Sequence, residues 1–97
     1  MEKEYDVYEI LYDGIVKYVG VTENYTRRVR EHLKGGKISA IPKGVNKRDV
    51  VIISAYETNS KEDAYRVEDK LIEEFDTINN GWNKNRSGYR SKNIYNI

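Results

Sequence analysis

The sequence predicts a small α+β domain, in which a three-stranded antiparallel sheet is flanked by helices. Two short segments rich in β-branched and aromatic residues lie on either side of Asp13-Gly14, which is typical of a β-hairpin. A third β-rich segment and two segments with helical spacing of apolar residues complete the pattern. A chain of 97 residues buries only roughly 60 to 65 % of its unfolded surface. We therefore expect one domain, with its core at about residues 5–83 and a basic, polar tail at 84–97.

The hairpin is predicted to pair residues 5–12 with residues 15–21. Two loop geometries fit the sequence. A two-residue turn would place Tyr8 and Tyr18 on opposite faces of the sheet, whereas a three-residue loop with Gly14 as a G1 bulge would set them opposite each other across the strands. The chemistry inferred below needs both tyrosines on one face, and so favours the three-residue loop.

A first helix is predicted from Tyr25 to about Lys34. Asn24 precedes it as an N-cap residue, and Gly35 with Gly36 supplies the left-handed backbone that ends a helix.

Residues 37–48 contain proline, glycine and asparagine, and are predicted to form a basic connecting loop. Residues 49–56 hold a run of valine and isoleucine that predicts a third, largely buried strand. Ser60 and Asp63 resemble a capping box, which opens a second helix that reaches about Phe75.

Charge is segregated along the chain, although the net charge is only +1. Residues 24–50 hold eight basic against two acidic side chains, and residues 81–97 hold four basic and no acidic ones. Residues 1–23 and 57–80 are acidic. The two basic segments are suited to a phosphate-facing surface, but they also fit the solvated faces of ordinary helices.

Composition excludes cysteine chemistry, and the N-terminal sequence gives no sign of a membrane segment. The chain has no cysteine, so disulfides, thiolate zinc sites and cysteine nucleophiles are absent. The charged N-terminal residues are followed by no apolar run long enough for a signal peptide or a membrane span, so we expect a cytoplasmic protein that does not enter a membrane.

A carboxylate on the predicted second helix occupies an unusual place. Glu68 shares the core-facing stripe with Ala64 and Leu71, whereas Asp69 and Glu73 are predicted to face solvent. A carboxylate directed at a core needs a partner or a metal ion. The alternative is that Glu68 borders the stripe and pairs with a basic residue of the first helix.

On the first helix, Arg28 and His32 are four residues apart and project from one face. A guanidinium can hold a phosphate through two hydrogen bonds, and a neutral imidazole can accept or relay a proton. The alternative is that His32, beside Leu33, is a half-buried packing residue.

Together these positions resemble the GIY-YIG nucleases. The hairpin carries Asp-Val-Tyr at 6–8 and Tyr-Val-Gly at 18–20, which look like the paired tripeptides that name the family. Arg28 falls eight residues after the second tripeptide, as the family's arginine does, and His32 lies one turn later, where members carry histidine or tyrosine. The first tripeptide departs from the name at its first two positions and keeps the tyrosine.

The resemblance continues to residue 83. Glu68 lies at the position of the family's metal-binding glutamate, and Asn-Gly-Trp-Asn at 80–83 resembles the closing motif of phage homing endonucleases. Some of those enzymes have a second histidine after the first helix; this chain has only His32.

The resemblance implies a metal-dependent DNA endonuclease. Glu68 would hold one Mg²⁺ or Mn²⁺, Arg28 would bind a phosphate oxygen, and either Tyr8 or Tyr18 would deprotonate the attacking water, with His32 as its hydrogen-bond partner or proton relay. Other side chains are expected to contact DNA or to support the site: Lys17, Arg27, Lys34, Lys37, Lys47, Arg48, Asn83, Lys84 and Arg86. For Lys17 the alternative is an ordinary lysine on the strand surface, and for Asn83 it is a supporting role.

Two other functions remain open at this point. The scaffold would suit a nucleic-acid-binding module that does not cut, or a phage anti-defence protein that binds another protein. No separate DNA-binding region is visible, so specificity would be relaxed, or would come from a homodimer, a protein partner or a longer chain. The expected setting is the cytoplasm of a bacterium or of a phage-infected host.

Overall fold

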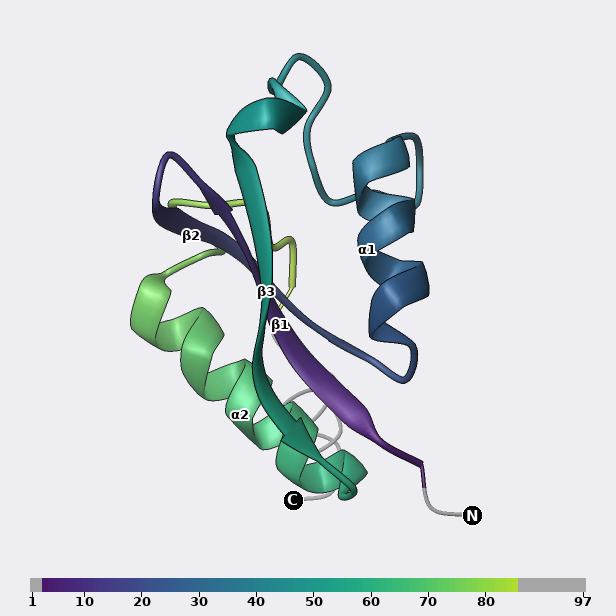
Figure 1. Cartoon of the computed structure of the whole chain (residues 1–97). Helices are drawn as coiled ribbons and strands as arrows, with labels where there is room; N and C mark the ends of the chain where they lie inside the picture. Colours follow the sequence, from purple (N-terminus) through teal and green to yellow (C-terminus); the bar gives the residue numbers. More distant parts are fainter. Residues whose placement is uncertain (1–2, 86–97) are drawn as a thin grey trace.

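A computed structural model describes residues 3–85 and confirms the predicted α+β fold (Figure 1). The three strands form one antiparallel sheet in the order β2-β1-β3, so β1 is central. The elements in chain order are β1 (Tyr5–Tyr12), β2 (Ile15–Thr22), α1 (Tyr25–Lys34), the 3₁₀ turn η1 (Lys47–Asp49), β3 (Val50–Thr58) and α2 (Lys61–Phe75). No helix among residues 3–85 is long and apolar enough to cross a membrane.

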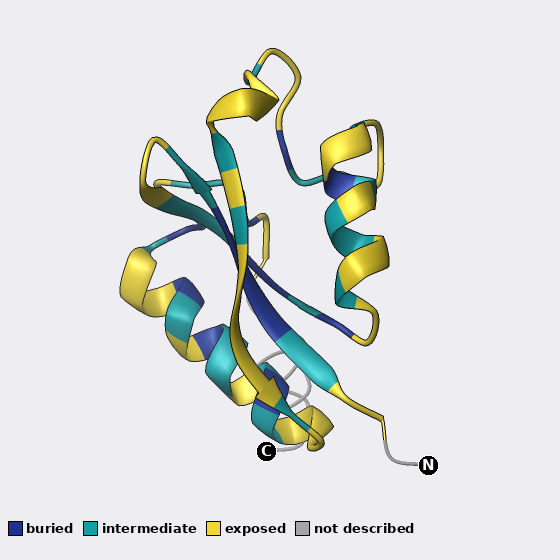
Figure 2. Cartoon of the chain, viewed as in Figure 1, coloured by how far each residue is buried: buried dark blue, intermediate teal, exposed yellow. Residues whose placement is uncertain are grey.

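Both faces of the sheet are covered. On one face α2 packs against the strands, and the core there consists of Val7, Val19, Ala64 and Ile72. On the other face, α1 and the connection that follows it lie over a second core built on Tyr8, Ile10 and Ile41 (Figures 1 and 2). The sheet therefore separates the two helices, and a site that uses both must form around a sheet edge.

The hairpin turn has the two-residue geometry. Asp13 and Gly14 both adopt positive φ, 51° and 76°, as a type I′ turn requires, and Tyr12 pairs with Ile15. The three-residue loop that the sequence analysis favoured is therefore wrong. Glycine tolerates this backbone without strain, and aspartate is among the few other residues that do.

The two tyrosines nevertheless share a face, because a β-bulge corrects the register. Pairing shifts between Ile10 and Leu11, so Lys17 becomes an extra residue on β2 and Tyr18 pairs with Ile10. Beyond the bulge Tyr8 pairs with Gly20, one diagonal step from Tyr18. The two tyrosines therefore share a face of the sheet, as the sequence predicted, but the bulge rather than the turn places them there.

Strand β3 lies where it was predicted but is not buried. It forms the outer edge of the sheet, and most of its residues are exposed, with Val51 56 % and Ile53 41 % accessible (Figure 2). A run of valine and isoleucine normally indicates a strand covered on both faces. Here α2 builds its core on β1 and β2, which leaves the α2 side of β3 open.

The predicted helix caps are present. The Asn24 side chain accepts a hydrogen bond from the Arg27 amide, and Ser60 does the same for Asp63. One prediction for α2 is wrong: Asp69 is buried, only 8 % exposed, rather than facing solvent. It lies one turn before buried Ile72, so the covered stripe of α2 is wider than the apolar residues alone indicated.

Candidate active site

Three rings meet on the α1 face of the sheet. Tyr8 comes from the central strand, Tyr18 from β2 and His32 from the last turn of α1. The ring centroids are 6.1 Å apart for the two tyrosines, 5.5 Å for Tyr8 and His32, and 5.6 Å for Tyr18 and His32. Tyr8 and His32 are almost fully buried, so both need partners for their polar atoms.

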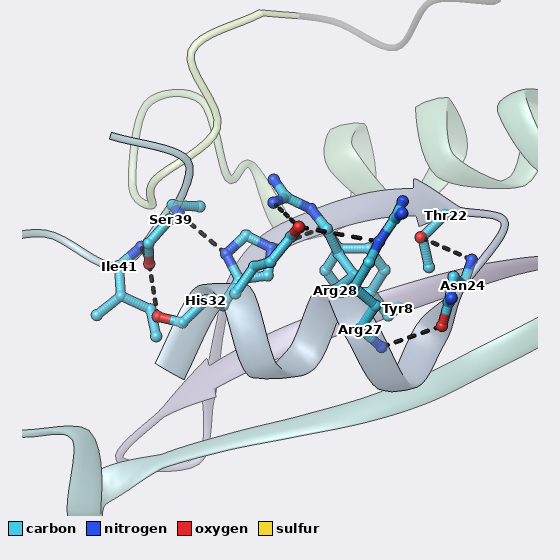
Figure 3. Close-up of polar contacts among 10 residues, drawn as sticks. Tyr8, Thr22, Asn24, Arg27, Arg28, His32, Ser39 and Ile41 are labelled. Carbon is cyan, nitrogen blue, oxygen red and sulfur yellow. Dashed lines mark hydrogen bonds and ion pairs between the residues drawn. The ribbon is translucent and has the colours of Figure 1, made fainter. Parts of the chain in front are cut away.

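The hydrogen bonds of His32 determine which ring nitrogen carries the proton. The backbone N–H of Ala40 donates to Nδ1 over 3.0 Å (Figure 3). An amide can only donate, so Nδ1 must be unprotonated and the neutral ring carries its proton on Nε2. Nε2 lies 2.8 Å from the Tyr8 hydroxyl oxygen, and therefore donates to it. The Tyr8 hydroxyl proton is then directed elsewhere.

A tight turn after α1 holds the Ala40 amide in place. The hydroxyl of Ser39 donates to the backbone carbonyl of His32 over 2.7 Å, and accepts from the Ile41 amide over 3.1 Å (Figure 3). Two hydrogen bonds, from the Ser39 hydroxyl and the Ala40 amide, thus tie the turn to His32 at the end of α1, and the third holds the turn together.

Burial sets the charge states of this group. Burial, followed by the nearby Arg28 guanidinium, lowers the pKa of His32 to about 4, so the ring is neutral near pH 7. Burial raises the pKa of Tyr8, and Tyr18 adds to the rise, while Arg28 opposes it. A phenolate at Tyr8 would therefore require additional positive charge beside it.

Arg28 is held between α1 and the tyrosines. Its Nη1 donates to Glu31 Oε1 over 3.0 Å, and its side chain is one quarter exposed. Arg28 thus lies beside Tyr8 (Figure 3), and part of its side chain is still accessible. The sequence analysis did not anticipate Glu31, since an acidic residue three positions along a helix is a common surface pattern.

Glu68 reaches the same region from the other face of the sheet. Its Oε1 is buried and has no hydrogen-bond partner among the described residues. Burial, and then the charge of Asp69, raises the pKa of Glu68 to about 7. The alternative considered above, an ion pair with α1, is not formed by the residues that the structure describes.

These side chains line a single open cleft of about 920 Å³ at the outer edge of β2. Tyr8, Tyr18, Arg28 and Glu68 all contribute to it, whereas His32 lies behind Tyr8. Four of the five candidate catalytic residues therefore face one space, and the fifth supports one of them.

The cleft suits one hard divalent cation. The buried, unpartnered oxygen of Glu68 is a ligand without a hydrogen bond to satisfy it. Residues 3–85 contain no group of three or more His, Cys, Asp or Glu side chains that could bind a metal. An ion at Glu68 would keep mostly water and phosphate ligands, which Mg²⁺ and Mn²⁺ accept and which structural zinc does not.

The closing motif, residues 80–83, binds the backbone along the outer edge of β2. The side-chain amide of Asn83 accepts from the Val19 N–H over 2.9 Å and donates to the Val19 carbonyl over 3.0 Å. The Trp82 amide donates to the Lys17 carbonyl at the bulge. Both polar atoms of Asn83 are thus bound to backbone, which is a supporting role, and the same contacts hold Trp82 beside the cleft.

Two glycines are required by close approaches. A Cβ at Gly20 would lie 2.5 Å from the Tyr8 hydroxyl, and a Cβ at Gly81 would collide with the Lys17 carbonyl. Any larger residue at Gly20 would displace Tyr8.

Most of the residues predicted to contact DNA lie outside the cleft. Asn83 and Lys84 line the cleft, and Lys17 donates to the Asn80 carbonyl over 3.2 Å. Five others are exposed but do not line it: Arg27, Lys34, Lys37, Lys47 and Arg48. Arg86 lies outside the described residues.

Comparison with known families agrees with this geometry. The model of the GIY-YIG catalytic domain matches residues 5–86, and the chain belongs to this family of nucleases. Comparisons with curated proteins and with solved structures gave no match.

Proposed function

We propose that this protein is a metal-dependent endonuclease that hydrolyses phosphodiester bonds of DNA. The observation that carries the proposal is the buried, unpartnered oxygen of Glu68 in the cleft that also holds Arg28 and two phenols. Nucleases of the family generally depend on divalent metals. The ion we propose is a single Mg²⁺ or Mn²⁺.

Glu68 would hold the ion, which when bound neutralises charge on the scissile phosphate and on the departing oxygen. Arg28 would bind a non-bridging phosphate oxygen with the accessible part of its guanidinium, since Glu31 occupies only one side. Both groups act where negative charge grows as the bond breaks.

Tyr8 is the tyrosine that we propose as the base. The Nε2–H of His32 donates to its oxygen, and Arg28 lies beside it, so a phenolate there has two stabilising neighbours. An ion in the same cleft would add the further positive charge that the raised pKa of Tyr8 requires. Tyr8 would first lose its hydroxyl proton to solvent, and the phenolate would then take a proton from water as the water oxygen bonds to phosphorus and the bond to the 3′ oxygen breaks. The leaving oxygen would take a proton from solvent. Tyr18, which shares the cleft, would orient the water.

The partner and the setting follow from the same proposal. DNA rather than RNA is proposed on the basis of the family, and sequence specificity would come from a homodimer or another protein. The likeness to phage homing enzymes and a cytoplasmic setting remain predictions.

Nicking of supercoiled plasmid tests the activity. We expect nicking with Mg²⁺ or Mn²⁺ and none with chelator, and a loss on the order of 10³-fold in Glu68→Gln, because a metal contributes several kcal/mol to such a transition state. Glu62→Gln, an exposed position of the same helix, is the matched control and should nick normally.

The same experiment separates cutting from binding. If plasmid and oligonucleotides are bound but never nicked in any divalent metal, the chain is a binding protein on a nuclease scaffold. If Glu68→Gln nicks as fast as the unmodified protein, Glu68 does not hold the ion.

A further inference from the structure

The cleft is lined by apolar and aromatic side chains as well as by polar groups. Besides the candidate catalytic residues, it is bordered by Ile38, Ile41 and Pro42 from the connection after α1, and by the rings of Tyr65 and Trp82. Ile38 is 56 % exposed, and Tyr65 and Trp82 are both half-buried. Among the described lysines and arginines, only Arg28 and Lys84 line the cleft.

This lining is poorly matched to double-stranded DNA. A duplex presents phosphates and sugars outward, while the faces of its bases are stacked inside, so proteins grip it with cations and polar groups. The exposed cations that would do so lie outside the cleft, at Arg27, Lys34 and Arg48 among others. The apolar and aromatic side chains beside the phosphate site are suited to another kind of ligand.

An unpaired strand supplies that ligand. Its base faces are free, and aromatic side chains stack on them with little sequence preference. Tyr65 lies three residues before Glu68 on α2, so its ring is a neighbour of the carboxylate on the same helix face. The Lys61 ammonium lies over the Tyr65 ring, 5.9 Å from its centroid, which adds a positive charge near the ring.

Contacts within the protein fix the Trp82 ring beside the cleft. Its ring packs against Tyr12 at 6.0 Å between centroids, and its amide is bound to the Lys17 carbonyl. A ring fixed before binding loses little freedom when a base stacks on it. A cleft of about 920 Å³ has the size of a small-molecule pocket, ~300–1,000 Å³, which suits a few nucleotides.

We propose that the cleft takes an unpaired DNA segment of a few nucleotides, with bases stacked on Tyr65 and Trp82 around the phosphate at Glu68. Single-stranded or locally unpaired DNA is then the preferred substrate. This inference rests on the proposed nuclease function for its cleavage arm, but binding can be measured independently of cleavage.

Binding is read from the protein itself, because Trp82 is the one tryptophan in the sequence. Oligothymidylate is added in the presence of chelator, and tryptophan fluorescence is followed. We expect quenching by the single strand, and several-fold less at equal concentration of a duplex. No quenching by oligothymidylate, or equal quenching by the duplex, overturns the proposal whether or not the protein cuts DNA.

Cleavage gives the second readout. With Mg²⁺, we expect kcat/KM to be about tenfold or more higher for a single strand, or for a duplex with an unpaired internal bubble, than for the perfect duplex. Tyr65→Ala should lower kcat/KM on the single strand about tenfold, and Tyr65→Phe should restore it, since stacking needs only the ring. Phe75→Ala is the control, as Phe75 is 40 % exposed on the same helix and does not line the cleft.

The outcomes separate the two proposals. Faster cleavage of perfect duplex, with no effect of Tyr65→Ala, leaves a nuclease but refutes the unpaired substrate. Quenching by single strands without any cleavage keeps the binding site and refutes the nuclease.

Discussion

The two sides of the cleft are prepared to different degrees. On the α1 side, both ring nitrogens of His32 and the oxygen of Tyr8 are engaged in hydrogen bonds. On the α2 side, Oε1 of Glu68 is buried with no partner among the described residues. The polar atoms of the α1 side have their hydrogen-bond partners within the protein. The Glu68 oxygen of the α2 side gains a partner only when a cation binds.

The difference separates two parts of the chemistry. Proton transfer depends on tautomer and orientation, which hydrogen bonds can fix during folding. Charge compensation depends on an ion that arrives later, and until then the carboxyl relieves its burial by keeping a proton, with a pKa of about 7. Single substitutions can alter one side at a time.

The largest effect is expected on the α1 side of the cleft. Tyr8→Phe removes the hydroxyl that we propose as the base, and should lower kcat on the order of 10²- to 10⁴-fold, the usual contribution of a general base. It also leaves the Nε2–H of His32 unsatisfied, at a stability loss of ~1–3 kcal/mol. Plasmid nicking rates and urea unfolding measure the two effects.

Tyr18→Phe is the matched comparison, since Tyr18 lines the same cleft but has no hydrogen bond to His32. We expect a loss of about tenfold, the smaller of the two. If Tyr18→Phe proves the more damaging and Tyr8→Phe is nearly neutral, the assignment of the base must be reversed.

The next effect, on the α2 side of the cleft, is a dependence of stability on pH. The pKa of Glu68 is raised in the folded protein to about 7 from 4.5, so the folded state holds the proton more tightly than the unfolded chain. Stability is then full below pH ~4.5 and is lost as pH rises through about 7. The loss is at most about 3 kcal/mol.

Glu68→Gln should remove this loss. The variant minus wild-type difference in free energy of unfolding should rise between pH 5 and 8, by chemical denaturation in chelator, and Mg²⁺ should shrink it by stabilising only the wild type. His32 contributes the opposite trend, because its pKa is lowered, but that contribution is common to both proteins. A difference that stays flat with pH would mean that Glu68 is not buried as described.

Much of this arrangement could be predicted from sequence. Four elements agree with the structure to within about a residue, because turn residues at Asp13-Gly14 and caps at Asn24 and Ser60 are local signals. The apolar stripe of α2 placed Glu68 toward the interior, where it lies.

The features that the sequence did not predict share a cause: each depends on contacts with distant parts of the chain. The bulge at Lys17 presents a carbonyl to Trp82, more than sixty residues away, and no local pattern predicts such a contact. The exposure of β3 depends on where α2 packs, not on its own residues. The turn that fixes the His32 tautomer works through the amide of Ala40, and a backbone amide leaves no trace in sequence.

A smaller effect tests that turn. Ser39→Ala removes the hydroxyl that ties residues 39–41 to the end of α1, so the Ala40 amide should bind Nδ1 of His32 less firmly. We expect part of the population to move the ring proton to Nδ1, and kcat to fall about five- to tenfold, the equivalent of one hydrogen bond. Because the chain has one histidine, long-range ¹H–¹⁵N spectra of labelled protein report its tautomer without ambiguity.

The control is Ser54→Ala, which removes a comparable hydroxyl contact, that of Ser54 with Asp6, on the exposed strand β3. Its spectrum and rate should match the wild type. A wild-type ring protonated on Nδ1 would contradict the proposed arrangement, and Ser39→Thr should recover the wild-type tautomer if the hydroxyl is what matters.

The smallest effect is expected at Arg27, the neighbour of Arg28 on α1. Arg27 is two thirds exposed, and its contact with Glu31 is 3.8 Å long, so Arg27→Ala should change stability by only about 0.5 kcal/mol or less. Arg28 shares Glu31 but lies three quarters buried beside Tyr8, so Arg28→Ala should abolish most nicking. If both substitutions slow nicking equally, Glu31 positions the two arginines as one unit, and the cleft is less distinct from the outer face of α1 than its lining indicates.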